Sequence, residues 1–73
     1  MKIGDKFKPN AKFFEQYPGC KELKIYTKKE NYLKVDKIPS KSGRYKYGVE
    51  LNGLNYGFNE EHVIPFKIIL ENK

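Results

Sequence analysis

Cationic side chains that can bind phosphate gather in one segment of the sequence, residues 37–46. The segment contains Lys37, Lys41, Arg44 and Lys46 and no acidic residue. Lysine and arginine contact nucleic-acid phosphates through charge and hydrogen bonds, and these contacts carry no sequence information. One hypothesis for the function is therefore a nonspecific nucleic-acid-binding accessory protein that uses a basic edge formed by this segment.

Single-stranded nucleic acid is also bound by aromatic rings that stack on its bases. Tyr26 and Tyr32 are the two rings expected to form an exposed aromatic platform, because the aromatics of residues 45–58 are predicted to face inward. Lys28, Lys29 and Lys34 lie near them in the sequence. These residues are a second place where phosphate and base contacts can combine.

The net charge of the chain has two interpretations. Fifteen basic and nine acidic residues give a formal charge of +6, and Arg44 is the single arginine among the cations. Such an excess suits an anionic partner. Lysine is also joined by abundant Asn, Ile and Tyr, a residue set that AT-rich coding DNA enriches. The charge alone therefore leaves open whether it serves a function.

The sequence offers few residues that could act as a catalytic nucleophile. Ser40 and Ser42 lie in one loop, Thr27 lies at the end of a predicted strand, and the only histidine, His62, is far from all three. A nucleophile needs a base within hydrogen-bonding reach. Cys20 is the only cysteine, so it forms no internal disulfide and is expected to be a free thiol.

Acid–base and metal chemistry are also not indicated. Glu60, Glu61 and His62 are adjacent in the sequence, so their side chains diverge instead of converging on one ligand. Gly48, Gly53 and Gly57 all lie within a predicted hairpin and make no phosphate-binding loop. We therefore predict a protein that is not an enzyme and that carries no cofactor or metal.

The length and composition predict a single domain over residues 1–73. The chain has 73 residues with five Phe and six Tyr, which is enough apolar area for a small core. No apolar run approaches the roughly 20 residues needed to span a bilayer. The N-terminus lacks the apolar stretch of a signal peptide. We expect a cytoplasmic protein that does not bind membranes.

The first half of the chain is predicted to contain one helix between extended segments. Residues 2–8 alternate as a strand that ends before Pro9, and Asn10 can cap a short helix with Ala11, Phe14 and Tyr17 on one face and Phe13 at its edge. Residues 23–27 and 31–38 are predicted to form a hairpin across a polar loop at 28–30.

The strongest local signal is Asn52–Gly53, which predicts a type I′ turn because both residues tolerate positive φ. With this turn the register is fixed, and Gly48 lies across from Gly57 on the face that carries Arg44 and Lys46. The paired glycines leave room for another backbone to approach. The opposite face, directed at the core, is predicted to hold Leu51 with Leu54, Val49 with Tyr56, Tyr47 with Phe58, and also Tyr45.

The tail is predicted to form a helical turn at residues 60–62 and then a last strand up to Leu70. Pro65 places this strand at an edge, or lies among its first residues. Ile68, Ile69 and Leu70 are consecutive apolar residues, which suits a strand covered on both faces. In a closed barrel the last strand would lie beside the first. The predicted fold is thus mainly β, a small barrel of five to six short strands with one short helix and a helical turn before the last strand.

The order of these segments resembles the SH3-like small barrels. The stretches that carry the resemblance are IGDKF, YLKV, YGVEL and YGFNEEHVIPF. The whole chain resembles the YorP family of small prophage-encoded proteins, which implies a viral origin, a compact mostly-β fold and no established activity or site residues. The chain lacks the tryptophan and the ALYDY-like run of the eukaryotic SH3 peptide groove, so binding of proline-rich peptides is not expected.

The first hypothesis for the function is a non-enzymatic binding module with an unknown protein partner. Small barrels expose strand edges and apolar patches that a partner can cover. Residues 66–70 are the apolar stretch that can remain exposed, at a partner interface or in a weak homodimer, although burial in the core of a monomer is the simpler reading. Nucleic-acid binding through residues 37–46 is the alternative.

Overall fold

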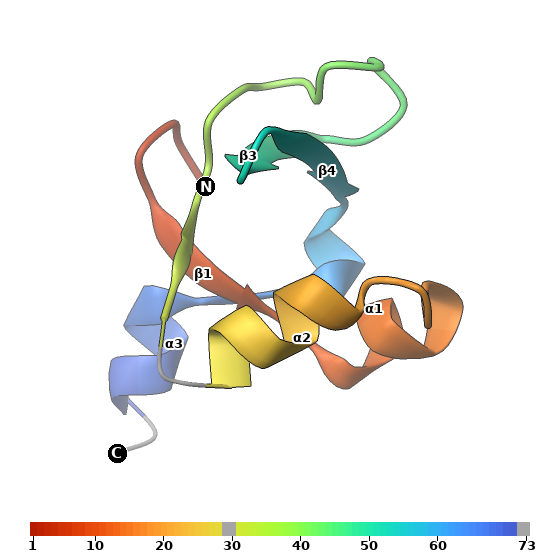
Figure 1. The fold of residues 1–73 in the computed structure, drawn as a ribbon. Coiled ribbons are helices and arrows are strands. Elements are labelled where there is room, and N and C mark those ends of the chain that lie inside the picture. The colour runs from red at the N-terminus through yellow and green to blue at the C-terminus, as the bar shows by residue number, and fades with distance from the viewer. Residues whose placement is uncertain (29–30, 72–73) are drawn as a thin grey trace.

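The computed structural model describes residues 1–28 and 31–71, with the side chains of 70 and 71 left out. Short helices and short strands are both present in this part of the chain (Figure 1). In chain order the elements are β1 (Lys6–Pro9), α1 (Ala11–Gln16), α2 (Lys21–Lys28), β2 (Leu33–Lys34), β3 (Tyr47–Leu51), β4 (Leu54–Phe58), the 3-10 turn η1 (Glu60–His62), β5 (Val63–Pro65) and α3 (Phe66–Glu71).

The strands form two antiparallel sheets. In the first sheet β1 lies between β2 and β5, and Phe7 is paired with Leu33 on one side and with Pro65 on the other. The second sheet is the hairpin of β3 and β4. In Figure 1 helices α1 and α2 lie below the hairpin of β3 and β4, and most of the loop of residues 38–46 lies above it. The end of this loop reaches α1, because the hydroxyl oxygens of Tyr45 and of Tyr17, the C-cap residue of α1, are 3.1 Å apart.

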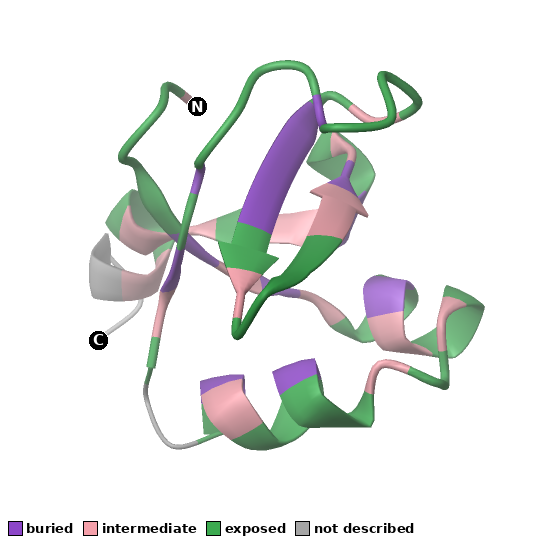
Figure 2. Ribbon diagram, turned by 45° about the horizontal axis from the view of Figure 1, so that its top comes forward, coloured by how far each residue is buried: buried purple, intermediate pink, exposed green. Residues whose placement is uncertain are grey.

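The predicted hairpin register is confirmed at every pair. Tyr47 faces Phe58, Val49 faces Tyr56 and Leu51 faces Leu54, and the turn residues Asn52 and Gly53 have φ of 52° and 79°. Burial decreases along β3 toward the turn, and β4 is more exposed than β3 (Figure 2). The six side chains therefore share a face, but only the half of the hairpin far from the turn enters the core.

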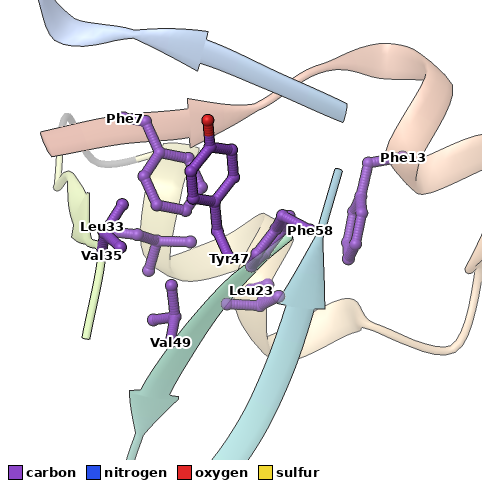
Figure 3. Close-up of a cluster of buried hydrophobic side chains, with 8 residues drawn as sticks. All are labelled: Phe7, Phe13, Leu23, Leu33, Val35, Tyr47, Val49 and Phe58. Carbon is purple, nitrogen blue, oxygen red and sulfur yellow. The ribbon is translucent and has the colours of Figure 1, made fainter. Parts of the chain in front are cut away.

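The core is a single cluster contributed by both sheets and by the first two helices (Figure 3). Phe58 lies at its centre, with its ring centroid 5.1 Å from that of Phe7 and 4.6 Å from that of Phe13. The buried apolar residues are Phe7, Phe13, Leu23, Leu33, Val35, Tyr47, Val49 and Phe58.

The prediction of a mainly β, SH3-like barrel is wrong. The described residues form a mixed α/β structure in which the two sheets do not close into a barrel. Between the sheets, the chain after β2 meets β3 at one isolated bridge, Lys37 with Gly48. The core is instead completed by α1 and α2, which supply Phe13 and Leu23.

The predicted strand at residues 23–27 is wrong, because these residues belong to α2. Leu23 and Thr27 are one helical turn apart and both buried, whereas Ile25 between them is 60% exposed. The Thr27 hydroxyl donates a hydrogen bond to the Leu23 carbonyl oxygen at 2.8 Å, as threonine does inside helices. The β-branched side chains favoured a strand, but packing against the core selects the helix. In the partner segment, β2 is confined to Leu33–Lys34.

The first strand is shorter than predicted. Gly4 has φ of 93°, which places residues 2–5 in a turn, and Ile3 is 65% exposed. The prediction that Asn10 caps a helix is confirmed, since its Oδ1 accepts the Phe13 N–H at 3.0 Å. The buried residue of this helix is Phe13, whereas Ala11 is exposed. The buried face is therefore centred on Phe13, which was predicted to lie only at its edge.

For residues 60–71, two predictions are confirmed and a third is wrong. Residues 60–62 form the predicted turn, and the following strand β5 is an edge strand that pairs with β1. The strand ends at Pro65, and residues 66–71 then form α3, so a strand reaching Leu70 was wrong. Ile68 is 45% exposed, and the side chain of Leu70 lies outside the described part.

None of the helices described for residues 1–28 and 31–71 is long and apolar enough to cross a lipid bilayer.

Candidate nucleic-acid interface

The outer face of the first sheet carries lysines and aromatic rings. In β1 the inward residue Phe7 alternates with Lys6 and Lys8, which therefore point outward, and Lys34 of β2 lies directly across from Lys6. Ile64 of β5 lies across from Lys8. We call the outward residues of this sheet and the two rings over them the lysine face. Its members are Lys6, Lys8, Tyr32, Lys34, Ile64 and Phe66.

Two rings from distant parts of the chain meet on the lysine face. Tyr32 precedes β2 and Phe66 follows β5, and their ring centroids are 4.7 Å apart at an interplanar angle of 81°. The Lys8 ammonium lies 4.9 Å from the Tyr32 centroid, and the Lys6 ammonium lies 5.7 Å from the Phe66 centroid. Both rings are half-buried. The face is thus an edge-to-face aromatic pair with a cation over each ring.

The charge of the lysine face is not neutralised within the described part of the chain. Lys6, Lys8 and Lys34 take part in none of the ion pairs found there. Asp5, next to Lys6, uses its carboxylate to accept the backbone N–H of Lys2 at 2.8 Å, and Asp36, two residues after Lys34, is exposed. An anion approaching the face would therefore meet ammonium groups without first breaking an ion pair.

The cations of the predicted basic edge at residues 37–46 are exposed, whereas its ring, Tyr45, is half-buried and packs against Gly57. The Lys46 ammonium lies 5.6 Å from the centroid of the neighbouring, buried Tyr47 ring. Lys37, Lys41 and Arg44 are exposed and take part in none of the described ion pairs. Lys46 instead bonds Glu60 at 2.6 Å, which raises the pKa of the Lys46 ammonium and lowers the pKa of the Glu60 carboxyl. Three of the four cations are therefore available to an external anion.

The glycine pair beside this edge is covered by the chain itself. A Cβ at Gly48 would lie 2.9 Å from the Cα of Ser40, and a Cβ at Gly57 would overlap the ring of Tyr45. The prediction that another backbone approaches here is confirmed for Gly48, and that backbone belongs to this chain. Tyr45 was wrongly placed on the inner face, because its ring packs on the glycine side of the hairpin.

The two tyrosines of the predicted aromatic platform have different surroundings. Tyr32 belongs to the lysine face, whereas Tyr26 is a half-buried residue of α2 that packs against the core. Lys28 is exposed, and Lys29 lies outside the described residues. Sequence reasoning did not include Lys6, Lys8 or Phe66 in the site. The alternation KFK at 6–8 was a signal for the two lysines.

The remaining polar residues at η1 maintain the fold. His62 is buried, its Nδ1 accepts the Asn59 N–H at 3.4 Å, and its Nε2 lies 2.7 Å from Gln16 Oε1, to which it donates. Glu61 bonds Lys12 at 2.8 Å, which lowers the pKa of the Glu61 carboxyl. The half-buried Cys20 is a free thiol whose pKa is raised by burial.

Comparisons of the chain with family models, with curated proteins and with solved structures found no match. The resemblance to the YorP family and its prophage origin therefore stay predictions.

Proposed function

We propose that the protein is a non-enzymatic accessory that binds single-stranded nucleic acid through the lysine face. The observation that carries this proposal is the aromatic pair Tyr32–Phe66 with a cation over each ring, on a face whose lysines take part in none of the described ion pairs. Such a role fits the cytoplasmic location and the prophage origin expected from the sequence.

Phosphates and bases would use different parts of the lysine face. The ammonium groups of Lys6, Lys8 and Lys34 would contact phosphates, because they are the charged groups at its surface. The rings of Tyr32 and Phe66 would contact bases, which stack on aromatic side chains with about 1–3 kcal/mol per base. Unstacked bases are accessible only in single strands, so this arrangement favours a single strand over a duplex.

The lysines over the rings do not prevent stacking. An exposed cation–π contact contributes about 0.5–1 kcal/mol, less than the stacking of a base. A base can therefore replace the Lys8 ammonium over the ring of Tyr32, and the flexible lysine can then reach the adjoining phosphate. The cations at residues 37–46 would add phosphate contacts without stacking, which keeps the basic edge as a secondary contact surface.

The test is fluorescence anisotropy with labelled single-stranded and double-stranded oligonucleotides between about 50 and 200 mM salt. The variant is Lys6→Ala with Lys8→Ala, and the matched control is Lys21→Ala with Lys24→Ala, which removes the same charge from exposed positions of α2. We expect log K of the wild type to fall with log salt. The slope should be smaller by about 1.4 in the Lys6/Lys8 variant, from two lost phosphate contacts to a single strand.

The control variant should keep the slope of the wild type. If both double variants change the slope equally, the binding follows overall charge and the proposed face is wrong. Absence of binding at about 50 mM salt, with protein at tens of micromolar, would overturn nucleic-acid binding itself. Tighter binding to duplex than to single strand would overturn the role of the rings.

A further inference from the structure

Within the described residues, backbone hydrogen bonds join the two sheets at one place, the bridge between Lys37 and Gly48. The Asp36 and Lys37 N–H groups both donate to the Gly48 carbonyl oxygen, at 2.8 and 3.1 Å, and the Gly48 N–H donates to the Lys37 carbonyl oxygen at 2.9 Å. This isolated bridge joins the segment after β2 to β3, which is drawn next to that segment in Figure 2. Beyond it, within the described residues, no backbone hydrogen bond joins β2 to β3.

The alternation of backbone directions along a strand shows which N–H and C=O groups face the space between β2 and β3. The Val35 N–H donates to the Asp5 carbonyl oxygen, and the Val35 carbonyl oxygen accepts from Gly4, so both groups of Val35 face the β1 side. Successive residues of a strand direct their backbone groups to opposite sides. The N–H and C=O of Lys34 therefore point away from β1, toward β3.

The same argument applies to β3. Gly48 uses its N–H and C=O toward residues 36 and 37, so the groups of Val49 point toward β4 and those of Glu50 point toward β2. Lys34 and Glu50 thus present backbone donors and acceptors to each other from opposite edges. Within the described part of the chain neither residue has a backbone partner on that side.

A groove of about 450 Å³ lies between these two edges. Its walls are residues 33–36 and residues 49–51, and Ile3 and Tyr26 also line it. The side chains of Val35 and Val49 are buried on the core side of the walls. The volume is in the range of ligand sites, and the two walls offer backbone hydrogen-bonding groups from facing strand edges.

We propose that this groove binds an extended segment of a partner protein, which adds as a strand between β2 and β3. A polypeptide in β conformation is the ligand that carries alternating N–H and C=O groups along both of its edges. It would bond Lys34 on one side and Glu50 on the other. Four wall residues at about 3.3 Å each set the length of the added strand at three to four residues.

The lining predicts the side-chain pattern of the added segment. Side chains that point inward would meet Tyr26 and Ile3, and the exposure of Ile3 is explained if an apolar residue covers it. Side chains that point outward would lie between the charged side chains of Lys34 and Glu50. The segment should therefore alternate apolar and polar residues.

The experiment selects ligands from a random linear peptide library displayed on phage, with the full chain immobilised, and measures the affinity of the enriched peptides. The variant is Glu50→Pro, which removes the one N–H of β3 that points into the groove beyond Gly48 and keeps the N–H groups bonded to β4. The matched control is Asn55→Pro, because Asn55 is the cross-strand neighbour of Glu50 and its N–H points to the opposite edge of the hairpin.

We expect enriched peptides with alternating apolar residues, at least tenfold weaker binding to Glu50→Pro, and unchanged binding to Asn55→Pro. Amide hydrogen exchange of the unaltered chain provides a readout without any variant. The Lys34 and Glu50 amides should exchange fast in the free protein and become protected when the peptide is bound.

Four results would overturn the proposal. They are the absence of enriched peptides, equal affinity for Glu50→Pro and the wild type, slow exchange of the Lys34 and Glu50 amides in the free monomer, and protection of these amides that appears only with a dimer. The third result would show that β2 and β3 pair directly, and the fourth would make a second copy of the chain the occupant.

Discussion

Phe58 is predicted to be the residue on which the two sheets depend most. Its side chain is fully buried and contacts Phe7 of the first sheet and Phe13 of α1, whereas its own strand belongs to the second sheet. Because the sheets share a single backbone bridge among the described residues, Lys37 with Gly48, side-chain packing must hold them together. Removal of this ring should therefore separate elements that no backbone ladder connects.

The magnitude follows from burial. Phe→Ala in a core costs about 3–5 kcal/mol, and each aromatic pair contributes about 0.5–1.5 kcal/mol within that loss. A chain of 73 residues has a free energy of unfolding of about 4–11 kcal/mol. Phe58→Ala should thus remove a large share of the stability. Phe58→Leu keeps most of the volume but loses the aromatic pairs, so its loss should be smaller, about 1–3 kcal/mol.

The assay is urea unfolding followed by far-UV circular dichroism. Leu54→Ala is the control, because Leu54 lies on the same face of the same strand but is 50% exposed, and its loss should stay near 0.5 kcal/mol. A loss below about 1 kcal/mol for Phe58→Ala would mean that the ring does not join the sheets. Equal losses at Phe58 and Leu54 would contradict the burial gradient along the hairpin.

Two further predictions concern the hairpin and the ion pair beside it. Gly57→Ala should destabilise by about 1–3 kcal/mol in the same assay, because the added Cβ overlaps the Tyr45 ring, and an unchanged urea midpoint would mean that this ring lies elsewhere. The Glu60 carboxyl has a pKa lowered by its bond to Lys46, so the stability from this pair is present above the unfolded pKa of about 4.3 and is lost as the pH falls through the lower folded value. Thermal unfolding from pH 7 to pH 3 should therefore show a smaller acid-induced drop in Tm for Glu60→Gln than for the wild type, and equal drops would exclude the pair as a source of stability.

The parts of the fold that the sequence predicted correctly are those with a short-range cause. Asn52–Gly53 sets the register of β3 and β4 because two consecutive positive φ angles select one type of turn. Asn10 begins α1 because its side chain accepts a backbone N–H three residues later. In both cases the deciding interaction lies within four residues, so no knowledge of the rest of the chain was needed.

The two helices that were missed depend on contacts distant in the sequence. Residues 23–27 contain Ile25 and Thr27, which suit a strand, and only the burial of Leu23 and Thr27 together reveals the helical period. In α3 the run of Ile68 and Ile69 suggested a strand covered on both sides. No second layer covers this run in the described structure, where Ile68 is exposed, and the closed barrel that would have supplied one is absent.

The same limit explains why the lysine face could not be predicted from the sequence. Its rings come from Tyr32 and Phe66, which are 34 positions apart and meet only because β1 lies between β2 and β5. Once β1 has two neighbours, alternation in KFK directs Phe7 into the core and both lysines to the outer face of the sheet. The order of the strands therefore determines where the cations and rings of the lysine face come together, and the local density of charge at residues 37–46 does not. For this reason Lys6 and Lys8 should be tested before Arg44.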